Sequence, residues 1–344
     1  MEQFMKSFKH FEKLDSDMQG VVKQLMQFGA APIESLDVNS ARNNPTFKNS
    51  VDEMASHSAL VRTLNVAMPV LPEKVAKVSH IAIPSSNGKL NTRVFYPQED
   101  AQHLPVIVYF HGGGWVIADL NVYESSCRAL CNAAESVVIA VAYRQSPEAK
   151  FPAAVEDAYD SLQYVIKNAA RFGGDPLQVV VAGESAGGNL ATVSCILAKE
   201  RGGEQPAAQV LIYPVTDTSM SQTSYAENQD TQPLHTPMMP WFWKHYLGEE
   251  SDKENYLVAP LLAPDVSGLP PAVVVTAEFD PLRDEGEAYA TKLKNAGVPV
   301  RFKKFDGVVH EFFGLAGAVG KAKEALKFVA GGIKEILNEQ QNQK

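Results

Sequence analysis

The chain has 344 residues, of which 45% are hydrophobic and 21% are charged, a composition typical of globular proteins that excludes disordered and fibrous classes. At about 150 residues per domain the length suggests two units, although large α/β domains extend further as one. With 31 basic and 40 acidic side chains the net charge is -9, which argues against a nucleic-acid partner because such binders carry clustered positive charge.

Cysteine usage and the N-terminus favour a cytoplasmic protein. Three cysteines, Cys127, Cys131 and Cys195, cannot form a disulfide framework, and the odd count suits a reducing compartment. Cys127 and Cys131 lie four residues apart in a predicted helix, so we interpret them as buried small hydrophobes rather than metal ligands. The first 27 residues lack the apolar core of a secretory signal. The sequence contains no run of about 18 apolar residues, so we expect no membrane span.

The first 70 residues have a helical, amphipathic pattern. Apolar side chains recur at spacings of three and four over Phe4–Leu14 and again over Val21–Met26. Asn43-Asn44-Pro45 interrupts the first helical stretch, and residues 51–66 predict a further helix.

From about Val75 onward, short β-branched runs alternate with helical patterns, which is typical of βα units on a mostly parallel sheet. Eight strands are predicted, over Val78–Ile83, Asn91–Tyr96, Val106–Phe110, Val137–Val141, Val179–Ala182, Ala208–Tyr213, Ala272–Thr276 and Val300–Phe305. Five helices are predicted between or after them, over Val122–Ala134, Ala153–Ala170, Gly188–Arg201, Gly286–Ala296 and Lys321–Asn338. Asn87-Gly88 is a hairpin signal between the first two strands, so this edge should be antiparallel. We therefore expect an α/β fold in which helices flank an eight-stranded, mostly parallel sheet.

One segment, from about Asp217 to Tyr256, breaks the alternation. It is rich in Ser, Thr and Gln at first and then contains Met238-Met239-Pro240-Trp241-Phe242-Trp243. Long insertions in compact domains are usually lids or binding loops. We therefore expect a catalytic domain over residues 71–344 and one helical cap over the carboxyl edge of the sheet, made of residues 1–70 and of the insertion at 217–256.

Gly183-Glu184-Ser185-Ala186-Gly187 matches the pattern G-x-S-x-G. The pattern alone is weak, but here it lies between a predicted strand and a predicted helix. A strand-to-helix elbow forces its central residue into strained backbone angles, and glycines on either side relieve the crowding. The elbow places the Ser185 hydroxyl in a cleft, so we interpret Ser185 as a nucleophile rather than as a helix cap.

An activated serine needs a base, and the base needs an orienting acid. In this architecture the chain order is Ser, then Asp or Glu, then His, each after a later strand. Asp280 follows the seventh predicted strand and His310 follows the eighth, so both should lie at the edge from which Ser185 emerges. We favour Asp280 as the acid, with Asp284 and Glu278 as alternatives. Of the other histidines, we expect four to lie at the surface: His10, His57, His80 and His103. Two more, His235 and His245, belong to the cap insertion.

A glycine-rich loop, His111-Gly112-Gly113-Gly114-Trp115, directly follows the third predicted strand. Consecutive glycines leave the backbone bare, so that its amides can point at a developing oxyanion. In acyl-transfer geometry the amide of Ala186, one residue after the nucleophile, completes the donor set. A phosphate-cradling loop is the competing use of such glycines, but the Lys-Ser/Thr pair and the G-x-G-x-x-G spacing are missing.

Four aromatic residues are candidates for the walls of a substrate pocket: Trp115, Trp241, Phe242 and Trp243. Packing inside the core of the cap is an equally good interpretation of each. The choice depends on the direction in which each ring points.

Together these motifs resemble those of the hormone-sensitive lipase family of α/β-hydrolases, in its bacterial (family IV) esterase branch. The resemblance extends over about residues 75–315. Further matching motifs occur in the expected order: Tyr143-Arg144-Gln145-Ser146-Pro147-Glu148, Phe151-Pro152-Ala153-Ala154, Gly173-Gly174-Asp175-Pro176, Gly268-Leu269-Pro270-Pro271 and the stretch from Asp280 to Gly286.

The resemblance implies an α/β-hydrolase fold with a cap made from the N-terminus and an insertion after the sixth strand. It implies hydrolysis of carboxylic esters with short to medium acyl chains, and no cofactor or metal. The residue roles that it implies are a nucleophile, a base, an acid and three oxyanion-binding backbone amides (Ser185, His310 and Asp280; Gly113, Gly114 and Ala186).

Two departures from the family pattern leave the triad positions untouched. Glu311 stands where members often have Gly, and Gln145-Ser146 replaces the usual Leu-Ala of the tyrosine motif. We expect the carboxylate of Glu311 to point to solvent rather than to raise the pKa of His310. Glu184 and Glu148 are expected to be hydrogen-bonding supports.

We therefore expect a serine carboxylesterase that acts on a small-molecule ester through an acyl-enzyme, with neither a nucleic-acid nor a membrane partner. A homodimer is an open possibility, since family members often dimerise. The alternatives are a non-catalytic receptor of the same fold, which the presence of His310 disfavours, and an amidase or peptidase with the same triad. A triacylglycerol lipase is disfavoured because the sequence shows no secretion signal and no large apolar lid.

Overall fold

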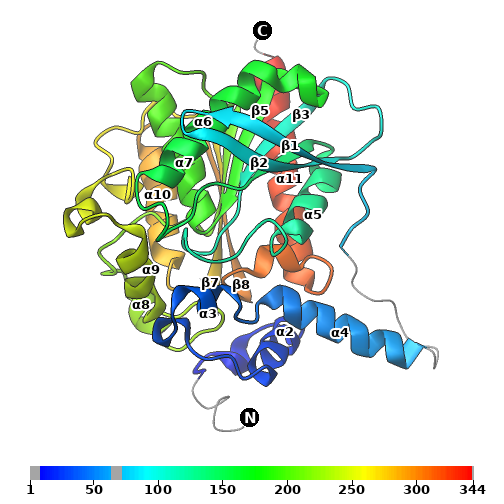
Figure 1. Cartoon of the computed structure of the whole chain (residues 1–344), viewed down its shortest axis with the longest axis vertical. Helices are drawn as coiled ribbons and strands as arrows, with labels where there is room; N and C mark the ends of the chain where they lie inside the picture. The colour runs from blue at the N-terminus through cyan, green and yellow to red at the C-terminus, as the bar shows by residue number, and fades with distance from the viewer. Residues whose placement is uncertain (1–7, 63–71, 343–344) are drawn as a thin grey trace.

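The structure is a computed structural model that describes residues 8–62 and 72–342, and its centre is one eight-stranded sheet (Figure 1). The strands are β1 (Lys77–Ser85), β2 (Gly88–Tyr96), β3 (Leu104–Phe110), β4 (Val137–Val141), β5 (Gly174–Glu184), β6 (Ala208–Ile212), β7 (Ala272–Phe279) and β8 (Val300–Val309). Their order across the sheet is β1-β2-β4-β3-β5-β6-β7-β8. β2 pairs antiparallel with both β1 and β4, and all other neighbours are parallel. The expected α/β fold with a mostly parallel sheet is confirmed.

The β1–β2 hairpin is confirmed at the predicted turn, where Ser85 pairs with Gly88. Most strands are longer than predicted. β8, for example, continues beyond its predicted end at Phe305 through Asp306 and Gly307 to Val309. Asp306 and Gly307, which are rare in strands, ended the local pattern at Phe305, but pairing with β7 resumes at Val309, which lies opposite Phe279.

Helices cover both faces of the sheet (Figure 1). α5 (Glu124–Ala134) and α11 (Gly320–Gln341) pack on one face, and α6 (Ala153–Asn168), α7 (Ala186–Arg201) and α10 (Arg283–Asn295) pack on the other. Successive residues of β3 alternate between the two cores: Val106 and Val108 pack with α6 and α7, whereas Ile107 and Tyr109 pack with α5 and α11. Because both faces are buried, the central strands are apolar throughout.

The N-terminal part is less regular than the amphipathic pattern predicts. The helices here are α2 (Ser16–Gln27), α3 (Val38–Arg42) and α4 (Phe47–Arg62), and the predicted break at Asn43-Asn44-Pro45 is confirmed. Before α2 there is only a 3₁₀ turn at Phe11–Lys13, so the helix expected over Phe4–Leu14 is wrong where it can be seen; Phe4 lies outside the described residues. The Asp15 amide donates to the Gly307 carbonyl (2.9 Å), a tertiary contact that holds the chain in this irregular path. The predicted end of the helix at 51–66 also lies outside the described residues.

The insertion carries two short helices, α8 (Thr223–Glu227) and α9 (Met238–Tyr246), which lie at the same end of the molecule as α2 and α3 (Figure 1). Trp241 Nε1 donates to the Leu36 carbonyl (3.2 Å), and His235 Nε2 lies 2.9 Å from Glu34 Oε1. Segments some 200 residues apart in the chain are thus in direct contact. Further 3₁₀ turns are at Ile33–Ser35, Ala169–Phe172, Glu250–Glu254, Pro260–Leu262 and Phe312–Leu315.

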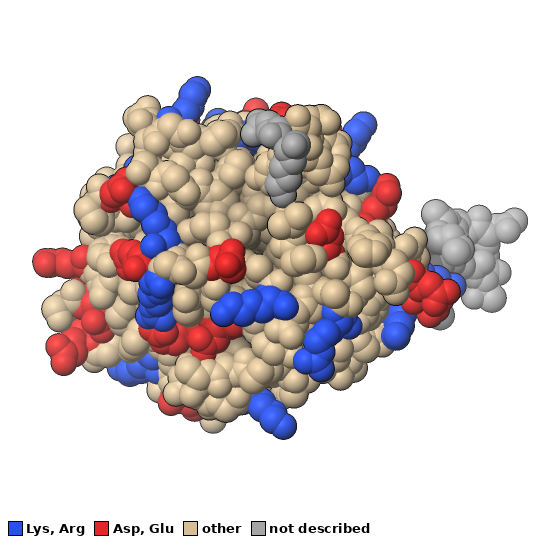
Figure 2. All heavy atoms as spheres, turned by 90° about the horizontal axis from the view of Figure 1, so that it is seen from above, with Lys and Arg blue, Asp and Glu red and all other residues tan. Residues whose placement is uncertain are grey.

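The surface mixes charges of both signs. On the face that Figure 2 shows, Lys and Arg side chains lie among Asp and Glu side chains. Cys127 and Cys131 are buried, which confirms their interpretation as small hydrophobes. Within residues 8–62 and 72–342, no helix combines the length and the apolar character that crossing a membrane requires.

Candidate active site

Ser185 stands at the turn between β5 and α7. Its backbone angles, φ 57° and ψ -119°, are rarely adopted by L-residues. A Cβ at Gly183 would lie 2.1 Å from the Gly187 carbonyl oxygen, and one at Gly187 would lie 2.0 Å from that of Phe110. The Ser185 amide donates to the Ile212 carbonyl (2.9 Å), which holds the turn against β6. The two glycines therefore permit a sharp strand-to-helix elbow that no larger residue would allow.

Asp280 and His310 reach Ser185 from the loops that follow β7 and β8. His310 Nδ1 lies 2.7 Å from Asp280 Oδ2, and His310 Nε2 lies 2.9 Å from Ser185 Oγ. All three side chains are buried, and the other carboxylate oxygen of Asp280 accepts the Leu282 amide (2.9 Å). In such an arrangement a carboxylate orients an imidazole whose second nitrogen can take the proton of a serine hydroxyl.

The electrostatic surroundings make His310 a stronger base than a free imidazole. Burial lowers the pKa of His310, but the charge and hydrogen bond of Asp280, with contributions from Glu311 and Glu184, outweigh it and raise the pKa overall. The imidazole is neutral, and so able to accept a proton, only above this raised pKa.

Gly113 and Gly114 line the same cavity as Ser185. Both have positive φ, 98° and 57°. A Cβ at Gly113 would lie 2.2 Å from the Ile117 carbonyl oxygen, and one at Gly114 would lie 2.2 Å from Cδ1 of Phe242. Neither amide donates a hydrogen bond to any group in the described part of the chain. Both donors are therefore available to an oxygen atom bound beside Ser185.

Ala186 directly follows Ser185, and His111 begins the glycine loop. Ala186 is the first residue of α7, where backbone amides have no acceptor within the helix. His111 is stacked on Tyr143, with ring centroids 4.4 Å apart, and its Nδ1 lies 2.7 Å from the Gly112 carbonyl oxygen. Burial lowers the pKa of His111 to about 4, so this histidine is neutral and braces the glycine loop.

A cavity of about 160 Å³ lies beside Ser185, between the sheet edge and the helices of the N-terminal part and the insertion. Met238, Met239 and Phe242 line it from one face of α9. Trp115 lines it from the glycine loop. The wall is mostly apolar, as in many small-molecule sites.

The other two aromatic candidates point elsewhere. Trp241 donates its indole N–H to the Leu36 carbonyl, and Trp243 packs against Trp115 with ring centroids 5.4 Å apart. They lie on faces of α9 other than the face that carries Phe242, because a helix turns by about 100° per residue. The expectation of pocket walls is therefore corrected for Trp241 and Trp243, which hold the helix to its neighbours.

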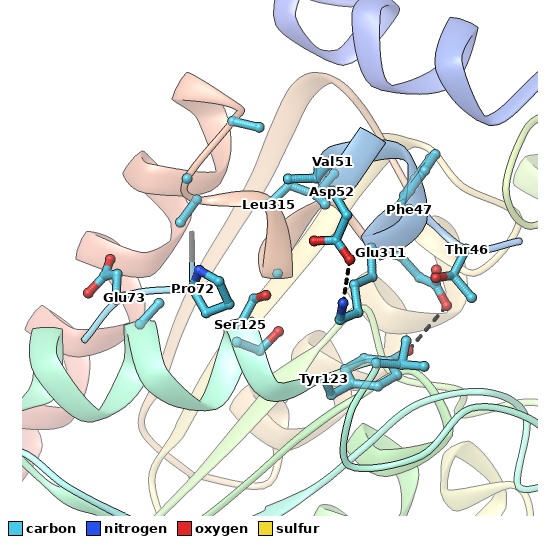
Figure 3. Close-up of a pocket in the computed structure, with 18 of the residues that line it drawn as sticks. Thr46, Phe47, Val51, Asp52, Pro72, Glu73, Tyr123, Ser125, Glu311 and Leu315 are labelled. Atoms are coloured by element: carbon cyan, nitrogen blue, oxygen red, sulfur yellow. Dashed lines mark hydrogen bonds and ion pairs between the residues drawn. The ribbon is translucent and has the colours of Figure 1, made fainter. Parts of the chain in front are cut away.

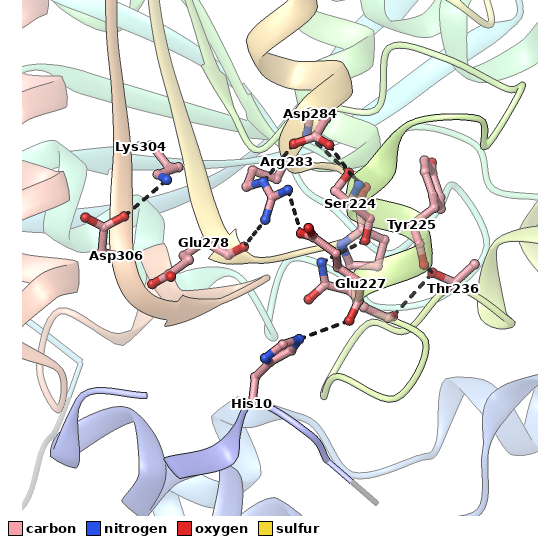
Figure 4. A network of polar contacts seen from close by, with 12 residues as sticks. His10, Ser224, Tyr225, Glu227, Thr236, Glu278, Arg283, Asp284, Lys304 and Asp306 are labelled. Carbon is pink, nitrogen blue, oxygen red and sulfur yellow. Dashed lines mark hydrogen bonds and ion pairs between the residues drawn. The ribbon is translucent and has the colours of Figure 1, made fainter. Parts of the chain in front are cut away.

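The insertion is bonded to the loop that carries the catalytic-acid candidate (Figure 4). Ser224 Oγ donates to the Pro281 carbonyl (2.6 Å), and the Ser224 amide donates to Asp284 Oδ2 (2.8 Å). The Tyr225 hydroxyl donates to Glu285 Oε2 (2.7 Å). All these hydrogen bonds join residues in the first turn of α8 to residues that follow Asp280 by at most five positions.

His10 joins the same network from the N-terminal part (Figure 4). Its Nε2 lies 3.1 Å from the Glu227 carbonyl oxygen, and its ring stacks on Phe279 at 5.0 Å. The expected surface position of His10 is therefore wrong: the side chain is buried between α8 and the end of β7. His80 and His103 are exposed as expected, and the side chain of His57 lies outside the described residues.

Glu184 and Glu148 are hydrogen-bonded supports, as expected. The carboxylate of Glu184 accepts hydrogen bonds from the hydroxyls of Tyr109 and Tyr213. Burial raises the pKa of Glu184, while the hydrogen bonds from these tyrosines act in the opposite direction. Glu148 forms an ion pair with Arg42 (2.7 Å).

Glu311 does not point freely to solvent, and the expectation is wrong. Its backbone is left-handed (φ 63°), its side chain is half-buried, and Oε1 accepts a hydrogen bond from the Tyr123 hydroxyl (3.1 Å; Figure 3). Its charge contributes to the raised pKa of His310. The backbone turn and the distant Tyr123 together direct the carboxylate inward.

Several residues around the site have no sequence signal of their own. Tyr123 is 188 positions from Glu311, and Ser224 and Tyr225 lie in a polar stretch without a motif. Glu285 had a weak signal, since it belongs to the charged run that follows Asp280. Among the residues that the structure describes, no three His, Cys, Asp or Glu side chains are grouped to hold a metal ion.

Comparisons with known proteins agree with this geometry. A family model described as an alpha/beta hydrolase fold matches residues 107–314. The chain is 35% identical over 297 residues to carboxylesterase NlhH of Mycobacterium tuberculosis, which covers 86% of this chain and 93% of that protein. It is 34% identical over 264 residues to ethyl acetate hydrolase of Pseudomonas putida, covering 76% and 83% of the two chains.

Solved structures give the same result. The hyperthermophilic esterase of the archaeon Pyrobaculum calidifontis is similar with a TM-score of 0.82 at 36% sequence identity. The match covers 94% of this chain and 99% of that one.

Proposed function

Because the chain belongs to the α/β-hydrolase family, in the esterase branch that resembles hormone-sensitive lipase, we propose that Ser185, His310 and Asp280 are the catalytic triad of a carboxylesterase for short- to medium-chain esters. The chain is a serine carboxylic ester hydrolase like these relatives. The observation that carries the proposed mechanism is the unbroken line of hydrogen bonds from Ser185 Oγ through His310 to Asp280, beside two free backbone amides.

In the proposed acylation step, His310 Nε2 takes the proton of Ser185 as Oγ attacks the ester carbonyl carbon. The carbonyl oxygen becomes an oxyanion, which the amides of Gly113, Gly114 and Ala186 stabilise. Asp280 stabilises the imidazolium that forms. The imidazolium then gives its proton to the departing alcohol, and the acyl group remains on Ser185.

Deacylation repeats these steps with water. His310 removes a proton from the water, and the resulting nucleophile attacks the acyl-enzyme carbonyl carbon. The second tetrahedral intermediate collapses to the free acid, and the proton on His310 returns to Ser185 Oγ. The reaction uses side chains and backbone amides of this chain, and no cofactor takes part in it.

The cavity supports an ester with an apolar acyl group, because the wall beside Ser185 is mostly apolar. We also propose that residues 1–70 and 217–256 act together as one cap, because Leu25, Ile33 and Met238 all line this space. The expected cytoplasmic location stays a prediction, and whether the chain forms a homodimer, as family members often do, stays open.

The direct test replaces the nucleophile. Ser185→Ala should reduce hydrolysis of a chromogenic butyrate ester by about a millionfold, because nucleophile and base act as a unit. Circular dichroism should show an unchanged fold. A fluorophosphonate probe should label Ser185 of the wild-type protein, as a mass-spectrometric peptide map can show. Substantial turnover by the pure variant would contradict the assignment.

A substrate series separates the remaining alternatives. Activity should be highest on acetate to hexanoate esters and fall steeply for longer acyl chains; a maximum on long chains would indicate a lipase. Matched ester and amide substrates distinguish an esterase from an amidase, and binding without turnover would indicate a receptor.

A further inference from the structure

Glu311 lines both the catalytic cavity and a smaller neighbouring cavity of about 60 Å³, and Figure 3 shows the smaller one. Thr46, Val122 and Glu311 line both. Glu311 also directly follows His310 in the chain, and its left-handed backbone (φ 63°) turns the side chain toward Tyr123. A non-glycine residue in this conformation is uncommon and calls for a local reason.

One carboxylate oxygen of Glu311 is free to meet a ligand. Oε1 accepts the hydroxyl of Tyr123 at 3.1 Å. No side chain or amide in the described part of the chain donates to Oε2, and Oε2 is not among the fully buried atoms that lack a partner. This oxygen therefore faces open space.

The other fully charged side chain in the catalytic cavity is already neutralised. Arg42 pairs with both carboxylate oxygens of Glu148 at 2.7 Å and donates to the carbonyls of Val116 (2.9 Å) and Ser146 (3.0 Å). The charge of the Arg42 guanidinium is therefore already balanced by the carboxylate of Glu148. Among the described lining residues, Glu311 thus carries the one full charge that is not paired with an opposite charge.

The position of Glu311 determines which part of an ester it meets. In the proposed reaction His310 Nε2 delivers a proton to the departing alcohol, so the alcohol leaves past His310. Glu311 is the next residue of the same loop and lines the same cavity. A cationic group on the alcohol would approach the free carboxylate oxygen in a mostly apolar surrounding, where charge interactions are stronger than in water.

We propose that Glu311 is a specificity-determining residue that selects esters whose alcohol portion carries a positive charge, such as esters of amino alcohols. This inference rests on the proposed esterase function and names its substrate class. The acyl chain occupies the apolar wall formed by α9, and the ammonium group of the alcohol lies against Glu311 Oε2. Esters with an anionic alcohol portion are disfavoured by the same carboxylate.

The test compares two butyrate esters of the same shape, choline butyrate and its uncharged carbon analogue, 3,3-dimethylbutyl butyrate. The readout is the ratio of their kcat/KM values, because effects on the common acylation chemistry cancel in it. Wild-type protein should prefer the choline ester. Glu311→Gln, which keeps the shape and removes the charge, should lower the ratio about fivefold. The assay uses low salt and mildly alkaline pH, since burial raises the pKa of Glu311 and salt screens its charge.

Two further variants control the result. Glu335→Gln removes one charge from α11, where Glu335 pairs with Arg301 away from the cavity, and should leave the ratio unchanged. Glu311→Gly suits the left-handed backbone, so it should fold at least as well as the wild type and lose the preference as Glu311→Gln does. An equal ratio in wild type and Glu311→Gln, or a wild-type preference for the neutral ester, would overturn the role of Glu311. Failure to hydrolyse both esters would overturn the proposed function as well.

Discussion

Asp280 is the buried carboxylate that pairs directly with His310, the proposed base. Asp280 holds His310 Nδ1 at 2.7 Å, and its charge opposes the effect of burial on the pKa of His310. Glu278, one of the alternatives for the acid, is engaged elsewhere, because its Oε2 accepts the Gly307 amide (2.7 Å). Asp284, the other alternative, bonds to Ser224. The three carboxylates Glu278, Asp280 and Asp284 are close in the chain, but each has a different partner, and only Asp280 contacts His310.

Asp280→Asn should lower kcat about a thousandfold to ten-thousandfold, because the amide favours the wrong imidazole tautomer. The acid limb of the kcat/KM profile should also move to lower pH, since His310 loses the charge that raises its pKa. Rates of butyrate ester hydrolysis across a pH series measure both effects. Glu278→Gln is the control and should keep the wild-type profile; a loss as large as that of Asp280→Asn would reassign the acid.

At the scale of elements, α8 connects the insertion to the loop that carries Asp280, the proposed catalytic acid. Ser224 is fully buried and bonds to both Pro281 and Asp284, on either side of the turn that leads into α10 (Figure 4). The insertion therefore does more than line the cavity, because its hydrogen bonds also hold the loop that carries Asp280.

Ser224→Ala should lower kcat about tenfold with little change in KM, because small displacements of a catalytic group slow the reaction more than they weaken binding. The acid limb of the pH profile should shift in the same direction as in Asp280→Asn. Ser221→Ala, an exposed position in the same insertion, is the matched control. If Ser224→Ala changes the melting temperature but neither kcat nor the profile, the residue is structural only.

At the scale of the whole molecule, the buried carboxyl of Glu285 links folding to pH. Burial is the main cause that raises the pKa of Glu285 to about 8, and the charge of Asp217 acts in the same direction. Hydrogen bonds from Thr216 and Tyr225 act in the opposite direction. In an unfolded chain the same group has a pKa near 4.5. Because the folded protein favours the neutral carboxyl, this contribution to stability is complete below 4.5 and is lost as the pH rises through about 8.

Glu285→Gln should remove this dependence, since an amide does not titrate. Urea unfolding between about pH 5 and about pH 9 should show the wild type losing on the order of a few kcal/mol relative to the variant. The difference between the two curves isolates Glu285 from all other titrating groups. Parallel curves would show that the carboxyl is ionised in the folded protein throughout this range.

Motifs that are local in the chain were predictable. The elbow around Ser185, the glycine loop at 112–114 and the order of strands and helices follow from short-range rules on glycine, β-branched residues and apolar periodicity. Asp280 and His310 were predictable because each follows a strand, and the carboxyl ends of parallel strands meet at one edge.

Contacts between distant segments were not predictable. The inward turn of Glu311 depends on Tyr123, the burial of His10 depends on Phe279, and the direction of Trp241 depends on Leu36. The spacing of these residues along the sequence predicts none of the three pairs, because the partners come from distant segments that meet only in the folded chain. The chain pattern therefore determined the class of chemistry, which needs only a few residues at the ends of strands. Tertiary packing decided which side chains line the cavity, because that depends on where separate segments meet in space.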